Sequence, residues 1–143
     1  MGSQRFQDVR LIVMNLGAFR NGAAACIPGL GIVASQSSLR SHALLRHEYG
    51  HMLQYRKWGF FVYWLLIAPA SLLSARKARK NKSYNHMHCW TEWTANQLSF
   101  QYFSEPADWD LNRYPIVPPS AGFRVPPILR SDFDPDGKIK SVS

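Results

Sequence analysis

The run RHEYGHMLQY, residues 46–55, contains the pattern H-E-x-x-H, formed by His47, Glu48 and His51. Side chains four residues apart on a helix share one face, so the two histidines can present imidazole nitrogens to a single metal ion. Glu48 projects beside that ion, where its carboxylate can take a proton from metal-bound water without serving as a ligand. The spacing therefore predicts a hydrolytic site that uses an activated water molecule.

A hydrolytic zinc site needs a third protein ligand and an open position for water. The chain has three glutamates: Glu48, Glu92 and Glu105. Glu105 stands at the end of a predicted helix and is typical of a solvated residue. Glu92 is flanked by tryptophans in WTEWTAN, and a carboxylate in that setting needs a cationic partner. We expect Glu92 to be the third ligand and Asn96, one turn later, to orient a ligand histidine.

Two other interpretations of the motif compete with zinc hydrolysis. A histidine pair on a helix is often structural, but five His and three Glu in 143 residues give a chance occurrence of H-E-x-x-H of only about 0.004. Two histidines and one carboxylate also form the facial triad of non-haem iron oxygenases. That triad requires neither an adjacent glutamate nor two histidines in one helical turn, so Zn²⁺ is favoured as the cofactor.

HEYGH followed by WTEWTAN resembles the gluzincins, zinc metallopeptidases whose ligands are the histidines of H-E-x-x-H and a glutamate on a later helix. It is most similar to the small single-domain bacterial members, the minigluzincins. The resemblance covers about residues 40–103. It implies a metalloendopeptidase acting on peptide or protein substrates, with His47, His51 and Glu92 as zinc ligands and Glu48 as general base.

The resemblance has further implications for the cleft. The strand before the zinc helix, here Leu30–Ser35, would border the cleft and pair with extended substrate. The chain departs from the larger gluzincins in having residues 52–91 between the ligands and Asn96 in a region where they carry an acidic residue. The Tyr or His that stabilises the transition state in that family has no obvious counterpart in this chain. His86 is the preferred candidate, and the alternatives are two neighbours in SYNHMHCW, Tyr84 and His88, of which His88 is also a competing ligand.

The elements that must position these residues follow from the pattern of apolar residues and turns. Residues 9–19 and 30–35 are β-branched and apolar runs set off by Asn-Gly and Pro-Gly pairs, which predicts two or three strands. Apolar spacing predicts helices over about 39–57, with Gly59 just beyond, and about 89–103. After residue 103 the frequent prolines predict an extended segment.

These elements predict a small α+β, zincin-like single domain over residues 1–114. A short, mostly antiparallel sheet would pack on the H-E-x-x-H helix and on the helix that carries Glu92. Residues 115–143 would form an extended Pro-rich tail, packed on the domain or lying across the cleft. By the same resemblance, a tail in the cleft would act as an internal inhibitor.

Residues 58–75 contain no charged residue and precede the basic run RKARKNK at 76–82. A simple membrane crossing would separate Glu92 from the two histidines, so we expect this stretch to be buried against the helices. The alternative is a hairpin broken at Pro69 that dips into an anionic membrane surface through residues 58–82. Charge runs are also often solvated loops.

The chain carries a formal charge of +8 and has a pI near 9.9, which favours anionic partners. No nucleic-acid reader motif is present, so nucleic acid is not expected as a partner.

The cysteines and the N-terminus indicate the compartment. Cys26 and Cys89 stand in unlike contexts, which does not predict a disulfide, and the N-terminus does not resemble a secretory signal. Both observations favour the cytoplasm, with peripheral membrane attachment as the alternative. The non-enzymatic alternative is an inactive, zinc-stabilised module for membrane-surface or protein interaction.

Overall fold

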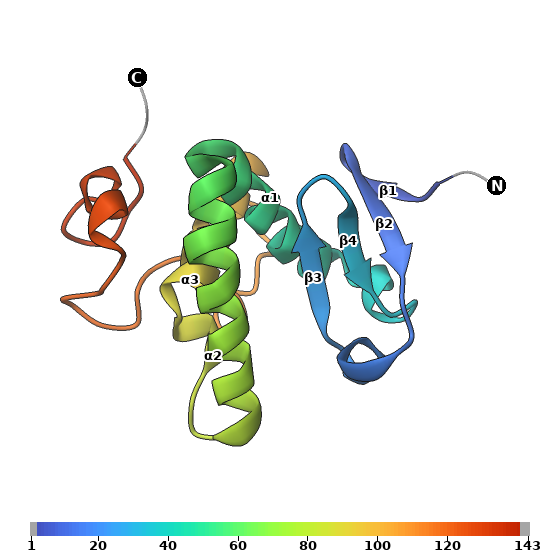
Figure 1. The fold of residues 1–143 in the computed structure, drawn as a ribbon. Helices are drawn as coiled ribbons and strands as arrows, with labels where there is room; N and C mark the ends of the chain where they lie inside the picture. Colours follow the sequence, from blue (N-terminus) through green and yellow to red (C-terminus); the bar gives the residue numbers. More distant parts are fainter. Residues whose placement is uncertain (1–2, 141–143) are drawn as a thin grey trace.

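The N-terminal part of the chain forms a four-stranded mixed sheet. The computed structural model describes residues 3–140 (Figure 1), and its strands are β1 (Arg5–Phe6), β2 (Val9–Val13), β3 (Ala24–Ile27) and β4 (Gly31–Ala34). Their order in the sheet is β1-β2-β4-β3. The β1–β2 and β3–β4 pairs are antiparallel, whereas β2 and β4 are parallel. The α+β class is confirmed, with one parallel pair in the sheet.

β4 lies inside the sheet, hydrogen-bonded to β2 on one side and β3 on the other. All four of its residues are buried. A short continuous apolar run of this kind fits a central strand buried on both faces. The expectation that Leu30–Ser35 pairs with substrate is therefore wrong, because both edges of β4 are already occupied. Within the described residues, β3 is the edge strand on this side of the sheet.

The H-E-x-x-H helix is α1 (His42–Val62). It begins at Ser41, whose hydroxyl accepts a hydrogen bond from the Leu44 N–H at 3.2 Å, as expected of a serine N-cap. Gly59 interrupts the helical conformation with φ 88° and ψ 176°, which glycine adopts without strain. The predicted end near residue 57 thus corresponds to a kink. Beyond it the chain continues helically through a π-helical segment, Tyr63–Ile67, into α2 (Ala68–Lys80).

The apolar stretch at 58–75 is only partly buried, and it does not fold into a hairpin. Phe61 is 75% exposed and Leu65 is 68% exposed, and the helix continues through Pro69 without a break. Proline is tolerated there because it stands in the first turn of α2, after the π-helical segment. The expected burial is therefore wrong for the outward face of this helix.

The second predicted helix is α3 (Trp90–Tyr102), which packs closely along α1. Gly50 makes this approach possible, since a Cβ added to it would lie 2.2 Å from the backbone oxygen of Ala95. The glycine between the motif histidines therefore lets α3 come near enough for Glu92 to reach them. Four short 3₁₀ turns complete the regular structure: Gly17–Asn21, Ser38–Arg40, His86–His88 and Pro127–Asp132.

Two apolar clusters hold these elements together. The first lies between the sheet and α1 and includes Ile32, Leu45 and Tyr49. The second joins α3 to the C-terminal segment, where Trp93 packs edge-on against Phe133. Residues 104–140 contain only one 3₁₀ turn and an isolated bridge, which confirms the predicted lack of regular structure. The described part of the tail, 115–140, lies on the side of α3 away from the sheet (Figure 1).

Replacing Gly50 by alanine should force α1 and α3 apart. The added methyl would overlap the Ala95 carbonyl, and overpacking of this kind costs about 1–3 kcal/mol in unfolding free energy. Chemical denaturation should show that loss, and metal affinity should fall with it because Glu92 moves away from the histidines. Lys80→Ala, on an exposed part of α2, is the matched control. Unchanged stability and metal affinity in Gly50→Ala would contradict the close approach.

Candidate metal centre

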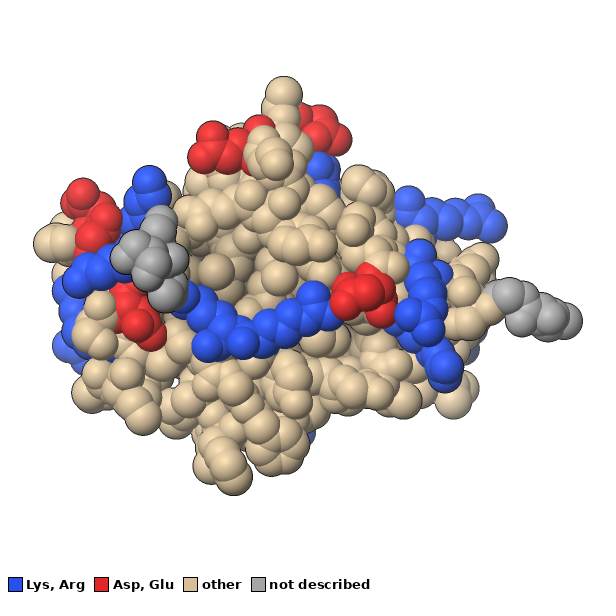
Figure 2. Space-filling view, turned by 90° about the horizontal axis from the view of Figure 1, so that it is seen from above, with Lys and Arg blue, Asp and Glu red and all other residues tan. Residues whose placement is uncertain are grey.

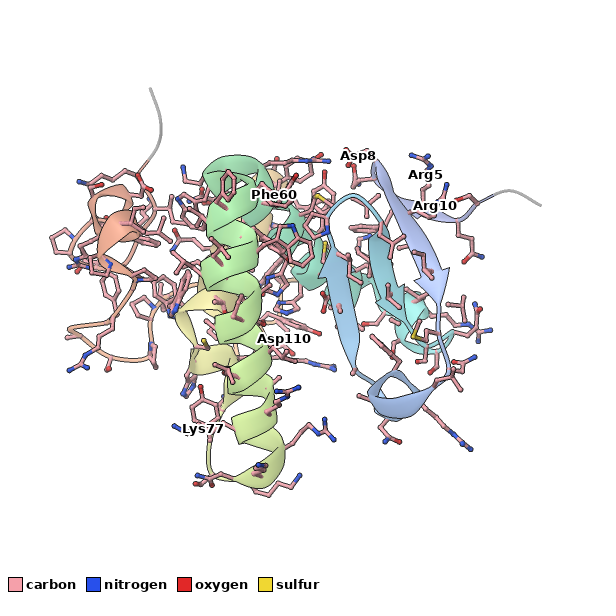
Figure 3. The ribbon with its side chains drawn as sticks, viewed as in Figure 1. Arg5, Asp8, Arg10, Phe60, Lys77 and Asp110 are labelled. Atoms are coloured by element: carbon pink, nitrogen blue, oxygen red, sulfur yellow. The ribbon has the colours of Figure 1, made fainter. Side chains whose placement is uncertain are left out.

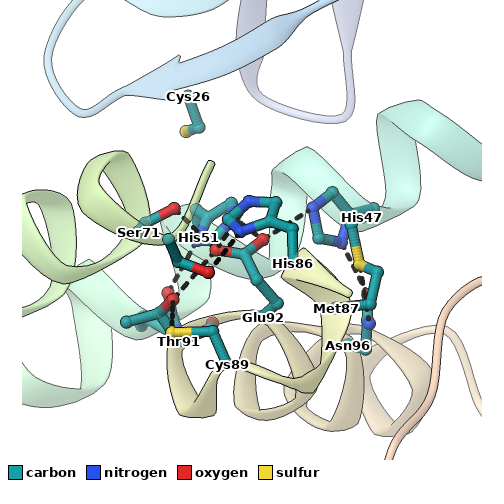
Figure 4. Close-up of polar contacts among 12 residues, drawn as sticks. Cys26, His47, His51, Ser71, His86, Met87, Cys89, Thr91, Glu92 and Asn96 are labelled. Carbon is teal, nitrogen blue, oxygen red and sulfur yellow. Dashed lines mark hydrogen bonds and ion pairs between the residues drawn. The ribbon is translucent and has the colours of Figure 1, made fainter. Parts of the chain in front are cut away.

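Two helices bring the predicted ligands together. His47 and His51 lie one turn apart on α1, and Glu92 in the first turn of α3 faces them (Figure 4). Oε2 of Glu92 is 3.2 Å from Nε2 of His47 and 3.3 Å from Nε2 of His51. All three residues are buried, and their ligand atoms lie within 4.8 Å of one another. This His-His-Glu cluster can hold a metal ion.

Asn96 orients the imidazole of His47, as the helical spacing predicted. Its Oδ1 is 2.6 Å from Nδ1 of His47, while its Nδ2 donates to the Pro115 carbonyl at 3.0 Å. Because the amide nitrogen is directed at Pro115, the atom facing His47 is an acceptor, and Nδ1 must carry the hydrogen. Nε2 of the neutral ring then has a free lone pair directed at Glu92.

Gln54 does the same for His51, and sequence reasoning missed it. Oε1 of Gln54 is 2.8 Å from Nδ1 of His51. Nε2 of Gln54 donates to the Thr91 carbonyl at 2.6 Å and to the Thr94 hydroxyl at 2.7 Å, which fixes the amide orientation. The available signal was its position three residues after His51, on the same face of α1. Both imidazoles therefore turn Nε2 toward Glu92.

Three electron-rich atoms thus meet in a buried space, which is stable only if a cation lies among them. Burial opposes a charge on His51, but Glu92 outweighs it and raises the pKa of His51 to about 9. Burial likewise opposes ionisation of Glu92, yet the charge of His51 and its hydrogen bond hold the pKa of Glu92 well below its usual range. Without metal, a proton on His51 supplies the positive charge.

The second carboxylate oxygen of Glu92 is held by hydroxyl groups. Ser71 on α2 donates to Oε1 at 2.6 Å, and Thr91 donates to it at 2.9 Å. These bonds leave Oε2 directed at the imidazoles. The role of Ser71 could not be predicted from the sequence, because Ser71 stands within an apolar run whose path depends on the Gly59 kink.

Glu48 lies beside the cluster on the wall of a cavity of about 450 Å³, a volume suited to a small ligand or a peptide segment. His47, His51 and Glu92 line the same cavity, so the cluster has an open side. Burial raises the pKa of Glu48, and the positive charge of the nearby histidines partly offsets the rise. A carboxylate with a raised pKa beside a metal site suits proton transfer near neutral pH.

Of the three candidates for a stabilising side chain, only His86 lines the cavity. Its Nε2 is 3.5 Å from Oε1 of Glu92, and its Nδ1 is 2.8 Å from the Ser74 hydroxyl. Burial lowers the pKa of His86, which keeps the ring neutral at physiological pH. Tyr84 instead hydrogen-bonds Ser74, and the exposed His88 lies against Asn85.

The cavity lies between the β3 edge and α2. Its walls include residues 22–26 on the sheet side and Ser71, Leu72 and Ala75 on the helical side. None of the described residues after Glu92 lines it. The described tail instead packs behind α3, where the buried Gln97 amide bonds the backbone of Ile116, Gly137 and Ile139. The described part of the tail therefore does not lie across the cleft, as an internal inhibitor would.

No protein-family model matches the chain, and neither the curated proteins nor the solved structures contain a significant match. The likeness to gluzincins thus remains one of motif. What the structure itself establishes is a buried His-His-Glu cluster that can bind a metal ion.

Removing either supporting amide should weaken metal binding while leaving the ligands in place. Loss of such a partner typically lowers metal affinity by about 10–100-fold, so we expect that reduction for both Asn96→Ala and Gln54→Ala. Competition with a chromophoric chelator measures it. Gln101→Ala removes an exposed amide from α3 and should bind metal like wild type. Wild-type affinity in both buried variants would show that the amides do not orient the ligands.

Metal binding should also depend on pH over an unusual range. The ion must displace the proton from His51, whose pKa is about 9, so the apparent association constant should rise about tenfold per pH unit between about pH 7 and 9. For an imidazole with the ordinary pKa of 6.5, the association constant would stop rising near pH 6.5. Chelator competition across this range distinguishes the two, and a plateau starting near pH 7 would contradict the His51–Glu92 interaction.

Proposed function

We propose that this protein is a zinc-dependent peptidase in which His47, His51 and Glu92 bind the metal and Glu48 is the general base. The observation that carries the proposal is the arrangement of the three ligand atoms on the wall of a cavity that Glu48 also lines. A structural zinc site is closed by four protein ligands, whereas a catalytic site has three and an open position. The resemblance of HEYGH and WTEWTAN to gluzincin motifs supports the same conclusion.

The donor set and its spacing fit zinc. Tetrahedral zinc with ligand bonds of about 2.0–2.1 Å requires neighbouring ligand atoms about 3.3 Å apart. The two nitrogen–oxygen distances to Glu92 are 3.2 and 3.3 Å. Iron in a facial triad would use the same residue types, but its chemistry has no need of Glu48 beside the first histidine. Zinc would make a water molecule acidic enough to attack a carbonyl group at neutral pH.

Glu48 moves the protons in this scheme. Its carboxylate takes a proton from the attacking water as oxygen bonds to the carbonyl carbon of the substrate. It then passes that proton to the amide nitrogen as the C–N bond breaks, which releases an amine and a carboxylic acid. The raised pKa of Glu48 suits both transfers. His86 lies on the cavity wall, and its Nε2–H, which is 3.5 Å from Oε1 of Glu92 and so makes only a weak contact there, would turn to the carbonyl oxygen as negative charge develops on it.

The sheet edge supports a peptide as substrate. β3 borders the cavity through residues 24–26 and has one edge without a partner strand among the described residues. An extended peptide can pair with that edge through its backbone, which places a peptide bond over the metal cluster. β3 thus takes the part that the sequence had assigned to Leu30–Ser35. The alanines on both cavity walls leave room for apolar substrate side chains.

Glu48→Gln should abolish peptide cleavage without loss of metal. The amide keeps the shape of the carboxylate but cannot accept the proton, so we expect kcat/KM to fall by at least about 100-fold. Cleavage of a quenched fluorescent peptide library, with metal content measured on the same samples, tests this. Asp110→Asn, at an exposed carboxylate that does not line the cavity, is the matched control.

Equal activity in wild type and Glu48→Gln would eliminate Glu48 as the base. A zinc-loaded wild-type protein that cleaves no library peptide would instead favour the inactive, zinc-stabilised interaction module.

A further inference from the structure

The helical segment from Phe60 to Lys80 exposes apolar side chains on one side, while its other side holds hydrogen-bonding hydroxyl groups beside the buried Tyr63 and Ile67. Toward the protein it presents hydroxyl groups that hydrogen-bond: Ser71 to Glu92, and Ser74 to Tyr84 and His86. An ordinary surface helix buries its apolar face and exposes its polar one. This segment differs in that its exposed side is apolar, while the hydroxyls of Ser71 and Ser74 lie on its inward side.

The outward face is correspondingly apolar. Phe61, Leu65 and Leu73 lie four and then eight residues apart along the helical segment, and their exposed fractions are 75%, 68% and 63%. Phe60 adds a further exposed ring at the upper end (Figure 3). In the most apolar 18-residue window of this helical segment only 17% of residues are buried. We call Phe61, Leu65 and Leu73 the outward stripe.

The same helix carries a basic cluster where the stripe ends. Arg76, Lys77 and Lys80 continue the exposed face, and Arg79 and Lys82 lie beside them. Figure 3 shows Lys77 near the lower end of α2, at the opposite end from Phe60. No aspartate or glutamate occurs in residues 49–91. The partner of this face must therefore supply both an apolar medium and negative charge.

From this combination we propose that α2 docks in the plane of an anionic lipid bilayer, with the outward stripe inserted among the acyl chains and the basic cluster against the headgroups. An exposed apolar stripe next to several cations is what surface attachment to anionic lipid requires. Figure 2 shows that the side of the molecule facing the reader in Figure 1 protrudes as a surface largely without charged residues.

The geometry favours lying on the bilayer over crossing it. Glu92 meets His47 and His51 at the metal cluster, so a chain that crossed through α2 would have to return through residues 81–89. That return runs along α2, where Tyr84 contacts Ser74 and Lys77. Lys82 and several polar side chains would then enter the hydrocarbon, at high cost.

Pairing with a second copy of the chain fits less well. It would cover the stripe, but residues 49–91 offer no carboxylate to neutralise the basic cluster of the other copy. Anionic headgroups supply that charge.

Sedimentation with lipid vesicles tests the proposal on the full-length, zinc-loaded protein. We expect it to bind vesicles of mixed phosphatidylcholine and phosphatidylglycerol, and to bind pure phosphatidylcholine at least about tenfold more weakly. The triple variant Phe61→Gln, Leu65→Gln, Leu73→Gln should lose at least about tenfold in partitioning, because its inserted area is gone. Its matched control changes three exposed apolar residues elsewhere: Leu111→Gln, Val117→Gln and Ile128→Gln.

A second pair of variants tests the charge. Arg76→Gln, Lys80→Gln and Lys82→Gln together should weaken binding to anionic vesicles by about 100-fold, at roughly fivefold per charge. Arg5→Gln, Arg20→Gln and Arg124→Gln remove the same charge from other exposed sites and should have a much smaller effect. Circular dichroism and zinc content identify variants that remain folded.

Three results would overturn the proposal: equal binding to both kinds of vesicle, equal losses in the test and control variants, or no binding by a folded wild-type protein. A wild-type dimer that the stripe substitutions dissociate, together with absent vesicle binding, would assign the face to self-association instead.

Discussion

The structure depends on the meeting of three electron-rich atoms from buried side chains. Nε2 of His47, Nε2 of His51 and Oε2 of Glu92 approach within about hydrogen-bonding range, and each is fixed from behind by an amide or by hydroxyl groups. The rings cannot turn away without breaking those buried bonds, so the repulsion between lone pairs and carboxylate has to be balanced by a cation. In the metal-free chain a proton on His51 balances this repulsion. A metal ion balances it as well, and an ion with an open coordination position can also bind water.

Much of the rest of the fold serves this meeting. Gly50 removes the one side chain that would keep α1 and α3 apart. The Gly59 kink redirects the helix, so that α2 passes Glu92 and places Ser71 on its carboxylate. The tail receives the free end of the Asn96 amide at Pro115, which secures the support of His47 from the far side of α3. Phe61, Leu65 and Leu73 face outward on the opposite side of the helical segment that carries Ser71.

The parts that sequence predicted are those set by local spacing. Helical periodicity placed His47 and His51 on one face of a helix, and put Glu92 and Asn96 one turn apart on another, so the ligand set and one supporting amide followed without coordinates. Gln54 and Ser71 were missed because their roles depend on how two helices pack, which no single segment specifies. The exposure of Phe61 and Leu65 was predicted wrongly for a related reason: composition alone does not tell a buried apolar helix from an exposed one. Strand order was beyond reach as well, since it depends on contacts distant in the chain, and so β4 was mistaken for an edge.

The most direct test of the central claim is anomalous diffraction at the zinc absorption edge from crystals of the protein loaded with one equivalent of Zn²⁺. We expect one strong peak at bonding distance, about 2.0–2.2 Å, from Nε2 of His47, Nε2 of His51 and a carboxylate oxygen of Glu92, with its open side toward the cavity. A peak elsewhere, or zinc bound by the histidines with Glu92 turned away, would contradict it.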